Sequence, residues 1–347
     1  MNARLESLVA RIAEEHATWD DPVVCREVFG TTDAEAIARV LDDACRTALG
    51  VRVVGARFYR VSVGCVAGLE LEDRTTAVVK VNRGDRPMAF HEASSAVRAH
   101  LAGAGFPCPL PLAPPLRVGT AVATFERLLE AGEPGDAHDP TVRAAVAASL
   151  AELVGLARGF AAIPALRPAW FTAIPAERLW PRPHSPLFDF DATAAGAAWI
   201  DDLARRARSR AAQATGPRVV GHFDWRVEHL RFSGDRVVAS YDWDSVHAEL
   251  ETVLVGAVAH GFTADWTRRD VVPVPALDEM RGFVADYERA RGAAFTPTER
   301  RVVAASLVYS LGYTARCCHA RGDLQPRADG DFRPVLRAHG EEILDAF

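Results

Sequence analysis

The sequence predicts an α+β fold, because strand and helix signals occupy different stretches of the chain. Between residues 51 and 82, three apolar runs rich in β-branched residues are separated by polar turns, a pattern typical of consecutive antiparallel strands. From about residue 138 onward, apolar residues recur at helical spacing instead. We therefore expect a small β-rich region followed by a mainly helical one, with further helices ahead of the strands.

Composition indicates a globular protein with one large two-lobed domain or two modest ones. The chain has 347 residues, and 49% of them are apolar, which is enough for a sizeable core. The net charge of −6 argues against a general nucleic-acid binder, which usually has a basic surface. A signal peptide and a membrane-spanning apolar run are not recognisable, and the six cysteines form no framework. We therefore expect a cytoplasmic protein, either a monomer or a homodimer, without membrane or nucleic-acid partners.

Helices are predicted ahead of the strands at residues 3–16 and 33–48. The first has an apolar stripe, and the second follows a Thr-Thr-Asp capping signal and ends before Gly50. We expect three domains: an N-terminal helical cap at 1–50, a β-rich region at 51–128 and a helical region at 129–347.

Lys80 lies inside the apolar run of the third predicted strand. A lysine in such a run is costly unless it meets an anion. The alternative is that Lys80 points to solvent from an edge strand.

The chain after this strand alternates between breaks and helices. Prolines interrupt residues 107–115, and a further strand is predicted at 121–128. Helices are predicted from about residue 138 and at 191–213. The long connector at 164–187 carries Trp170, Phe171 and Trp180, which either stack on a substrate or fill a groove between helices.

The most informative stretch lies between residues 219 and 245. A β-rich run leads into a polar loop, and two short apolar runs split by Ser-Gly-Asp then predict a β-hairpin. The second run ends in Asp242-Trp243-Asp244. Because the ends of a tight hairpin lie close together, we expect Asp224 and Asp242 to face one site.

Two carboxylates in one site repel each other unless a cation or a shared proton lies between them. Mg²⁺ prefers oxygen ligands and commonly takes one or two carboxylates plus substrate phosphates. The pair therefore favours phosphoryl transfer, with one acid as base and the other as metal ligand. The alternative is that both acids are solvated loop residues, which are common in turns.

Residues 222–243 resemble the catalytic loop and metal-binding strand of the aminoglycoside phosphotransferase and choline kinase-like family. The family pattern is His-Gly-Asp, four further positions, Asn, and later an apolar strand that ends in Asp-Trp. His222-Phe223-Asp224 and Asp242-Trp243 match this pattern. Two positions depart from it, because Phe223 replaces a small residue and His229 stands in place of the Asn.

The resemblance covers roughly residues 50–320 and implies a protein-kinase-like two-lobed fold. Asp224 would accept the proton of the acceptor hydroxyl, and Asp242 would bind Mg²⁺. His229 would be a second metal ligand or would instead hydrogen-bond Asp224. Arg226 would contribute charge toward the γ-phosphate or form a structural salt bridge.

The resemblance also implies a nucleotide site in the β-rich region. Lys80 and Glu92 would hold the α- and β-phosphates, and the backbone between Glu126 and Leu128 would form a hinge that meets the purine. The turn at 63–68 would cover the phosphates, although it has only two glycines, and its residues on their own favour a plain hairpin turn.

The sequence therefore predicts an ATP- or GTP-dependent O-phosphotransferase that acts on a small hydroxyl-bearing acceptor. An antibiotic, an amino alcohol and a sugar all remain open as acceptors, because fold does not fix substrate. The second hypothesis is a kinase-like nucleotide-binding module with weak or lost transfer activity, suggested by His229 and Phe223. A third is an unrelated helical interaction protein.

Overall fold

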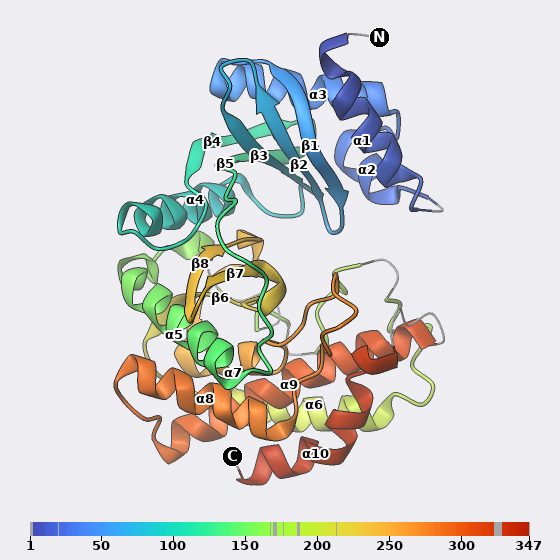
Figure 1. Cartoon of the computed structure of the whole chain (residues 1–347). Coiled ribbons are helices and arrows are strands. Elements are labelled where there is room, and N and C mark those ends of the chain that lie inside the picture. Colours follow the sequence, from blue (N-terminus) through green and yellow to red (C-terminus); the bar gives the residue numbers. More distant parts are fainter. Residues whose placement is uncertain are drawn as a thin grey trace. The chain divides into compact units, whose positions relative to one another are not determined.

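The computed structural model describes residues 3–346, apart from 20, 167, 169–171, 176, 186–187, 213 and 323–327. The chain forms two compact units, Met1–Glu130 and Ala131–Phe347 (Figure 1). The first unit contains a five-stranded antiparallel sheet, whereas helices dominate the second. This confirms the predicted α+β fold class. In the described part of the chain, no helix has both the length and the apolar character needed to cross a membrane.

The sheet of the first unit has the strand order β1-β2-β3-β5-β4, and all neighbours are antiparallel. Its strands are β1 (Val53–Val61), β2 (Cys65–Leu71), β3 (Thr76–Asn82), β4 (Pro111–Val118) and β5 (Ala121–Arg127). The first three are the strands predicted between residues 51 and 82. The strand β3 is central, so the alternative that placed Lys80 on an edge strand is wrong.

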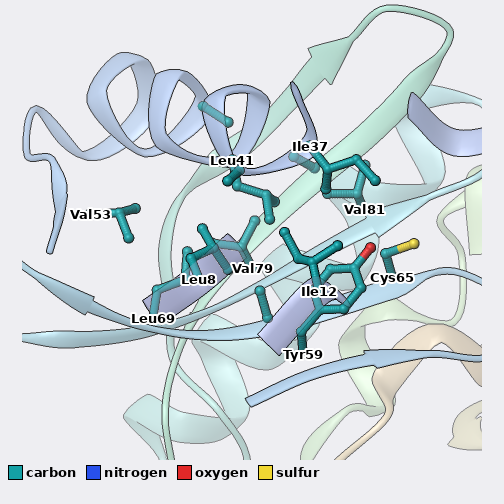
Figure 2. Packing of buried hydrophobic residues seen from close by; sticks show 14 of the residues in the cluster. Leu8, Ile12, Ile37, Leu41, Val53, Tyr59, Cys65, Leu69, Val79 and Val81 are labelled. Carbon is teal, nitrogen blue, oxygen red and sulfur yellow. The ribbon is translucent and has the colours of Figure 1, made fainter. Parts of the chain in front are cut away.

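Three N-terminal helices pack against one face of this sheet (Figure 1). They are α1 (Glu6–His16), α2 (Val23–Phe29) and α3 (Ala34–Leu49). The carboxylate of Asp33 caps α3 by accepting a hydrogen bond from Ala36 N at 2.7 Å, as its sequence signal predicted. Apolar side chains of α1 and α3, among them Leu8, Ile12, Ile37 and Leu41, lie against the sheet residues Val53, Tyr59, Leu69, Val79 and Val81 (Figure 2).

One buried carboxylate joins these helices to the sheet. Asp42 of α3 accepts hydrogen bonds from Arg4, from Arg52 and from the backbone N–H of Val53, at 2.6 to 2.9 Å. Burial alone would raise the pKa of Asp42, but these donors outweigh it and lower the pKa to about 2. The carboxylate of Asp42 is therefore ionised at neutral pH.

The helix α4 (Met88–Gly103) packs along β4 and β5 and carries a buried arginine. Arg98 Nη1 donates to the carboxylate of Glu126 on β5, and both side chains are about 5% exposed or less. This ion pair fixes the helix to the sheet. It also occupies the carboxylate of a residue that the sequence placed at the hinge.

The second unit consists of helices around two small sheets. Its helices are α5 (Pro140–Leu156), α6 (Ala198–Ala211), α7 (Glu251–Ala259), α8 (Leu277–Arg291), α9 (Pro297–Arg321) and α10 (Arg333–Ala346). Its strands are β6 (Arg218–His222), β7 (Leu230–Ser233), β8 (Arg236–Ser240) and β9 (Val246–Leu250), paired as β6–β9 and β7–β8. The helix expected at 191–213 begins only at Ala198, and β9 was not predicted.

The central helices α7 and α9 cross at close range. A Cβ atom built on Gly256 would lie 2.2 Å from the backbone oxygen of Val303, so only glycine allows this approach.

In the same unit, His138 links the start of α5 to α8. Its Nδ1 lies 2.7 Å from a carboxylate oxygen of Glu279, and its Nε2 lies 2.8 Å from the carbonyl of Val272.

The connector between α5 and α6 packs partly on α9. The ring of Trp180 lies 5.3 Å from that of Tyr309 and 6.2 Å from that of Tyr313, and its Nε1 donates to Asp201. For Trp180 this supports the expectation that the connector fills a groove between helices. Trp170 and Phe171 lie outside the described residues.

Candidate active site

The loop that follows β6 is held from several sides. Val227 N donates to Phe262 O at 2.9 Å, and the indole of Trp225 donates to Val146 O of α5 at 3.1 Å. Phe223, the bulky residue at a position the family keeps small, is buried with its ring 5.9 Å from that of His247 on β9. The loop therefore accommodates Phe223 by packing it on the neighbouring strand. Asp224 remains partly exposed within this rigid frame.

His222 locks the loop as a neutral imidazole. The side chain is fully buried, and burial lowers its pKa to about 4. Its Nδ1 accepts the N–H of Asp224 at 3.1 Å, so the proton sits on Nε2, which points to Tyr241 O at 3.3 Å. One ring thus ties the backbone of Asp224 to the residue before Asp242.

The predicted hairpin is formed by β7 and β8, and it delivers Asp242 beside the loop. The backbone N–H of Tyr241 donates to His229 O at 2.8 Å, which joins the strand end to the loop. Asp242 itself has φ 56° and ψ 52°, a left-handed conformation that is unusual for any residue but glycine. Strain of this kind concentrates at functional sites, because the surrounding structure must enforce it.

The structure brings Asp224, His229 and Asp242 together. One ligand atom from each lies within 4.8 Å of the others. His229 Nδ1 is 3.0 Å from the backbone oxygen of Asp224 and 3.6 Å from its carboxylate, and Nε2 is 3.7 Å from the carboxylate of Asp242. Because a backbone oxygen can only accept, Nδ1 of His229 is the donor in this bond, and Nε2 is the nitrogen that faces Asp242.

Arg226 is clamped between two carboxylates of its own loop. Its Nη1 donates to Asp224 Oδ1, and its Nε donates to Glu228 Oε2 at 3.0 Å. Burial would raise the pKa of Asp224, but the neighbouring charge of Arg226 lowers it below its ordinary value. Asp224 is therefore a carboxylate at neutral pH, with Oδ1 engaged by the arginine.

This group of side chains fits a divalent cation. Asp224, Glu228 and Asp242 carry three negative charges, and Arg226 balances one of them. Two carboxylates and one imidazole nitrogen then converge on one point. The oxygens are hard ligands suited to Mg²⁺, whereas the imidazole is a less preferred third ligand.

The other predicted site residues belong to the first unit. Lys80 is buried on β3, where it stands opposite Thr124 of β5 and Val66 of β2. Glu92 is exposed near the start of α4. Glu126 is paired with Arg98 as described above, and Leu128 lies half-buried just after β5.

The turn expected to cover the phosphates is a plain hairpin between β1 and β2. Ser62 N donates to Gly64 O at 2.9 Å, which closes the turn over three residues. A Cβ on Gly64 would lie 2.8 Å from the backbone oxygen of Val81, so this glycine is required for a close approach of two strands.

Sequence reasoning missed Glu228 as part of the site. It lies in the same loop, two residues after Arg226, and alternating charges at that spacing were the available signal. Sequence reasoning also missed a hollow of about 670 Å³ within the second unit. This hollow is lined by the segment 131–135, by Val142 and by the tip of the β7–β8 hairpin. Its components lie about 100 residues apart, so no local pattern marks it.

The fold and this site define a kinase-like phosphotransferase. The chain belongs to the phosphotransferase enzyme family, abbreviated APH, whose sequence model matches residues 68–293. The family resemblance expected from residues 222–243 is thereby confirmed, as is the prediction that the protein is a phosphotransferase enzyme. No curated protein matches the sequence.

Solved structures share the fold at low sequence identity. Amicoumacin kinase hAmiN, solved in complex with AMP-PNP, Ca²⁺ and Ami, has a TM-score of 0.56 and 10% identity, with 96% of each chain covered. A candidate aminoglycoside phosphotransferase from Ralstonia eutropha JMP134 has a TM-score of 0.54 and 14% identity, covering 88% of this chain and 97% of that one. A candidate fructosamine-3-kinase from Thermobifida fusca has a TM-score of 0.52 and 15% identity, covering 88% and 99%.

Proposed function

We propose that the protein transfers the γ-phosphoryl group of ATP or GTP to a hydroxyl group of a small molecule, with Mg²⁺ as the metal. The observation that carries this proposal is the convergence of Asp224, His229 and Asp242 within 4.8 Å. Two carboxylates so close together repel each other unless a cation or a shared proton lies between them, and the lowered pKa of Asp224 favours the cation. The family supports phosphoryl transfer, and solved relatives of this fold are described as kinases of small molecules.

Asp224 is the proposed base. Its Oδ1 is held by Arg226, which leaves Oδ2, on the side of His229, to accept the proton of the acceptor hydroxyl. Arg226 and His222 fix the position of this carboxylate from its side chain and its backbone. A base held in one orientation within hydrogen-bond reach of the hydroxyl is what proton transfer requires.

Asp242 and Nε2 of His229 are the proposed metal ligands. A Mg²⁺ ion held by these residues would offset negative charge that develops during phosphoryl transfer. The left-handed backbone of Asp242 holds its carboxylate toward the loop, and His222 and His229 brace it there through Tyr241.

Residues of the first unit are proposed to contact the nucleotide. Lys80 is assigned to the α- and β-phosphates, and the backbone from Glu126 to Leu128 to the purine edge, because the carboxylate of Glu126 is already engaged by Arg98.

The test measures binding and turnover separately. Mg·ATP and Mg·GTP should raise the melting temperature, and release of ADP or GDP should depend on an added acceptor from a panel of aminoglycosides, macrolides, amino alcohols and sugars. Asp224→Asn should lower turnover roughly 10²–10⁴-fold while nucleotide affinity stays nearly the same. The matched control is Asp202→Asn on the exposed face of α6, which should keep full activity.

The results discriminate between the hypotheses. Full activity of Asp224→Asn would remove this residue from the role of base. Nucleotide-dependent stabilisation without turnover on any acceptor would favour the second hypothesis, a nucleotide-binding module. No effect of either nucleotide would refute the proposal. His229→Asn, which restores the family residue, should keep or raise turnover if His229 serves only as a metal ligand.

A further inference from the structure

The first unit buries a pair of thiols between its N-terminal helices and its sheet. Cys25 belongs to α2, and Cys65 is the first residue of β2. Their sulfur atoms lie 3.8 Å apart although the residues are 40 positions apart in the sequence. The exposed fractions of the two residues are 0% and 2%. The fold therefore brings two distant cysteines into direct contact.

Polar groups surround this pair within an otherwise apolar core. Nε2 of His16 lies 3.2 Å from the sulfur of Cys25, and the hydroxyl of Tyr59 lies 3.5 Å from it. Figure 2 shows the sulfur of Cys65 beside the hydroxyl end of Tyr59. An imidazole can take up the thiol proton, and a hydroxyl can stabilise the thiolate by donating a hydrogen bond.

The surroundings distinguish Cys25 from the other buried cysteines. Burial raises the pKa of Cys45 and of Cys108 to about 12, which makes both thiols inert. At Cys25, the hydrogen bond from the Cys65 thiol lowers the pKa to about 6 against the opposing effect of burial. The Tyr59 hydroxyl and His16 act in the same direction. Thiolate character is what makes a cysteine a nucleophile.

We propose that Cys25 and Cys65 form an oxidative modification site, which closes as a reversible disulfide when the protein meets a hydroperoxide. The Cys25 thiolate attacks one oxygen of hydrogen peroxide and breaks the O–O bond. This yields a sulfenic acid and a hydroxide ion, which takes the proton held by His16 and becomes water. The sulfur of Cys65 then attacks the sulfur of Cys25, the S–O bond breaks, and the leaving hydroxide takes the Cys65 proton. Two thiols are oxidised, and one peroxide is reduced to two waters.

Local opening of α2 gives the oxidant access. This helix has only seven residues, and so short a helix depends on its packing for stability. Segments of this kind open more readily than the core of a unit. Closing the bond requires the sulfur atoms to approach from 3.8 Å to about 2.05 Å, a movement that a small shift of α2 supplies. The disulfide then fastens the N-terminal helices to the sheet.

The experiment treats the full chain with hydrogen peroxide and counts the thiols that remain. Alkylation under denaturing conditions should find two fewer than the six of the reduced chain, and peptide mapping should link Cys25 to Cys65. Dithiothreitol should restore both thiols. The link encloses about 40 residues and should stabilise the first unit by about 2–4 kcal/mol, so the melting temperature of this unit should rise by roughly 7–15 °C on oxidation. This readout does not depend on phosphoryl transfer.

Variants locate the effect. Cys25→Ser and Cys65→Ser should each lose the link and the rise in melting temperature, whereas Cys45→Ser should keep both. His16→Asn should slow closure and leave the product unchanged. Six alkylated thiols after peroxide, a link between other cysteines, or oxidation of Cys25 to a sulfinic acid without a link would each overturn the proposal. The decisive measurement is peptide mapping of the peroxide-treated chain without substitutions. A variant that fails to fold therefore does not affect the test of the proposal.

Discussion

The buried ion pair between Arg98 and Glu126 allows a quantitative prediction for the first unit. Replacing Arg98 by Met keeps a long side chain but leaves the carboxylate of Glu126 buried without its partner. Both side chains are about 5% exposed or less, so water cannot replace the lost contact. Breaking a buried pair from one side costs about 3–5 kcal/mol, because the remaining charge is uncompensated.

This cost is large compared with the stability of a domain, which is about 5–15 kcal/mol. For a unit of this size we expect Arg98→Met to lower the melting temperature by roughly 10–20 °C. The double variant Arg98→Met/Glu126→Leu removes both charges and should recover most of the loss, since an apolar replacement of a buried pair is often nearly neutral.

Thermal and urea unfolding, followed by circular dichroism, measure these differences. The matched control is Arg11→Met, which breaks an exposed pair with Glu14 and should cost at most about 1 kcal/mol. If Arg98→Met is no more destabilising than Arg11→Met, or if the double variant is as unstable as the single one, the ion pair does not hold α4 to the sheet.

Three further predictions concern stability. Gly256→Ala should destabilise the second unit by about 1–3 kcal/mol, because its Cβ would meet the backbone of α9; a melting temperature equal to that of the parent would contradict this. Asp42→Asn should lower the free energy of unfolding by about 2 kcal/mol at pH 7. The difference from the parent should vanish as the pH falls from about 4 to about 2, which is the pKa of Asp42 in the folded protein, and urea titrations at each pH measure it. The pKa of His138 is raised by its bonds to a carbonyl and a carboxylate, against the effect of burial. The stability that His138 adds to the folded state is therefore complete below its unfolded pKa and is lost as the pH rises through its folded pKa. The melting temperature of His138→Ala should therefore lie further below that of the parent at pH 6 than at pH 8.5. An equal difference in melting temperature at the two pH values would show that protonated His138 does not stabilise the fold.

Local signals predicted the hairpin and the placement of the paired aspartates. Ser233, Gly234 and Asp235 specify the turn, and a hairpin of fixed length places Asp242 beside the preceding loop. That stretch is short, so its geometry depends little on the rest of the chain.

Elements that depend on distant partners were not predictable in this way. The strand β4 contains prolines at 111, 114 and 115, which argued against a strand, but it lies at the edge of the sheet, where a missing N–H costs little. The strand β9 pairs with β6, and its letters before α7 read as the start of a helix. In each case the pairing partner decides the structure.

The charge partners of α4 illustrate the same limit. Sequence reasoning placed Glu126 at the hinge and gave no role to Arg98. In the structure the buried carboxylate opposite α4 is that of Glu126, and its partner on the helix is Arg98, six residues after Glu92. Which charges meet depends on the rotation of α4 on the sheet, and periodicity alone does not fix it.

The N-terminal helices have a practical consequence for anyone who expresses this protein. The recognisable family similarity begins at residue 68, in the middle of β2, and invites a shortened clone that starts there. Such a clone would lack β1 and all three helices, and Leu69, Val79 and Phe125 would lose their apolar cover. It should be insoluble because one apolar face of the sheet would be exposed, so residues 1–67, about a fifth of the chain, must be kept with the rest.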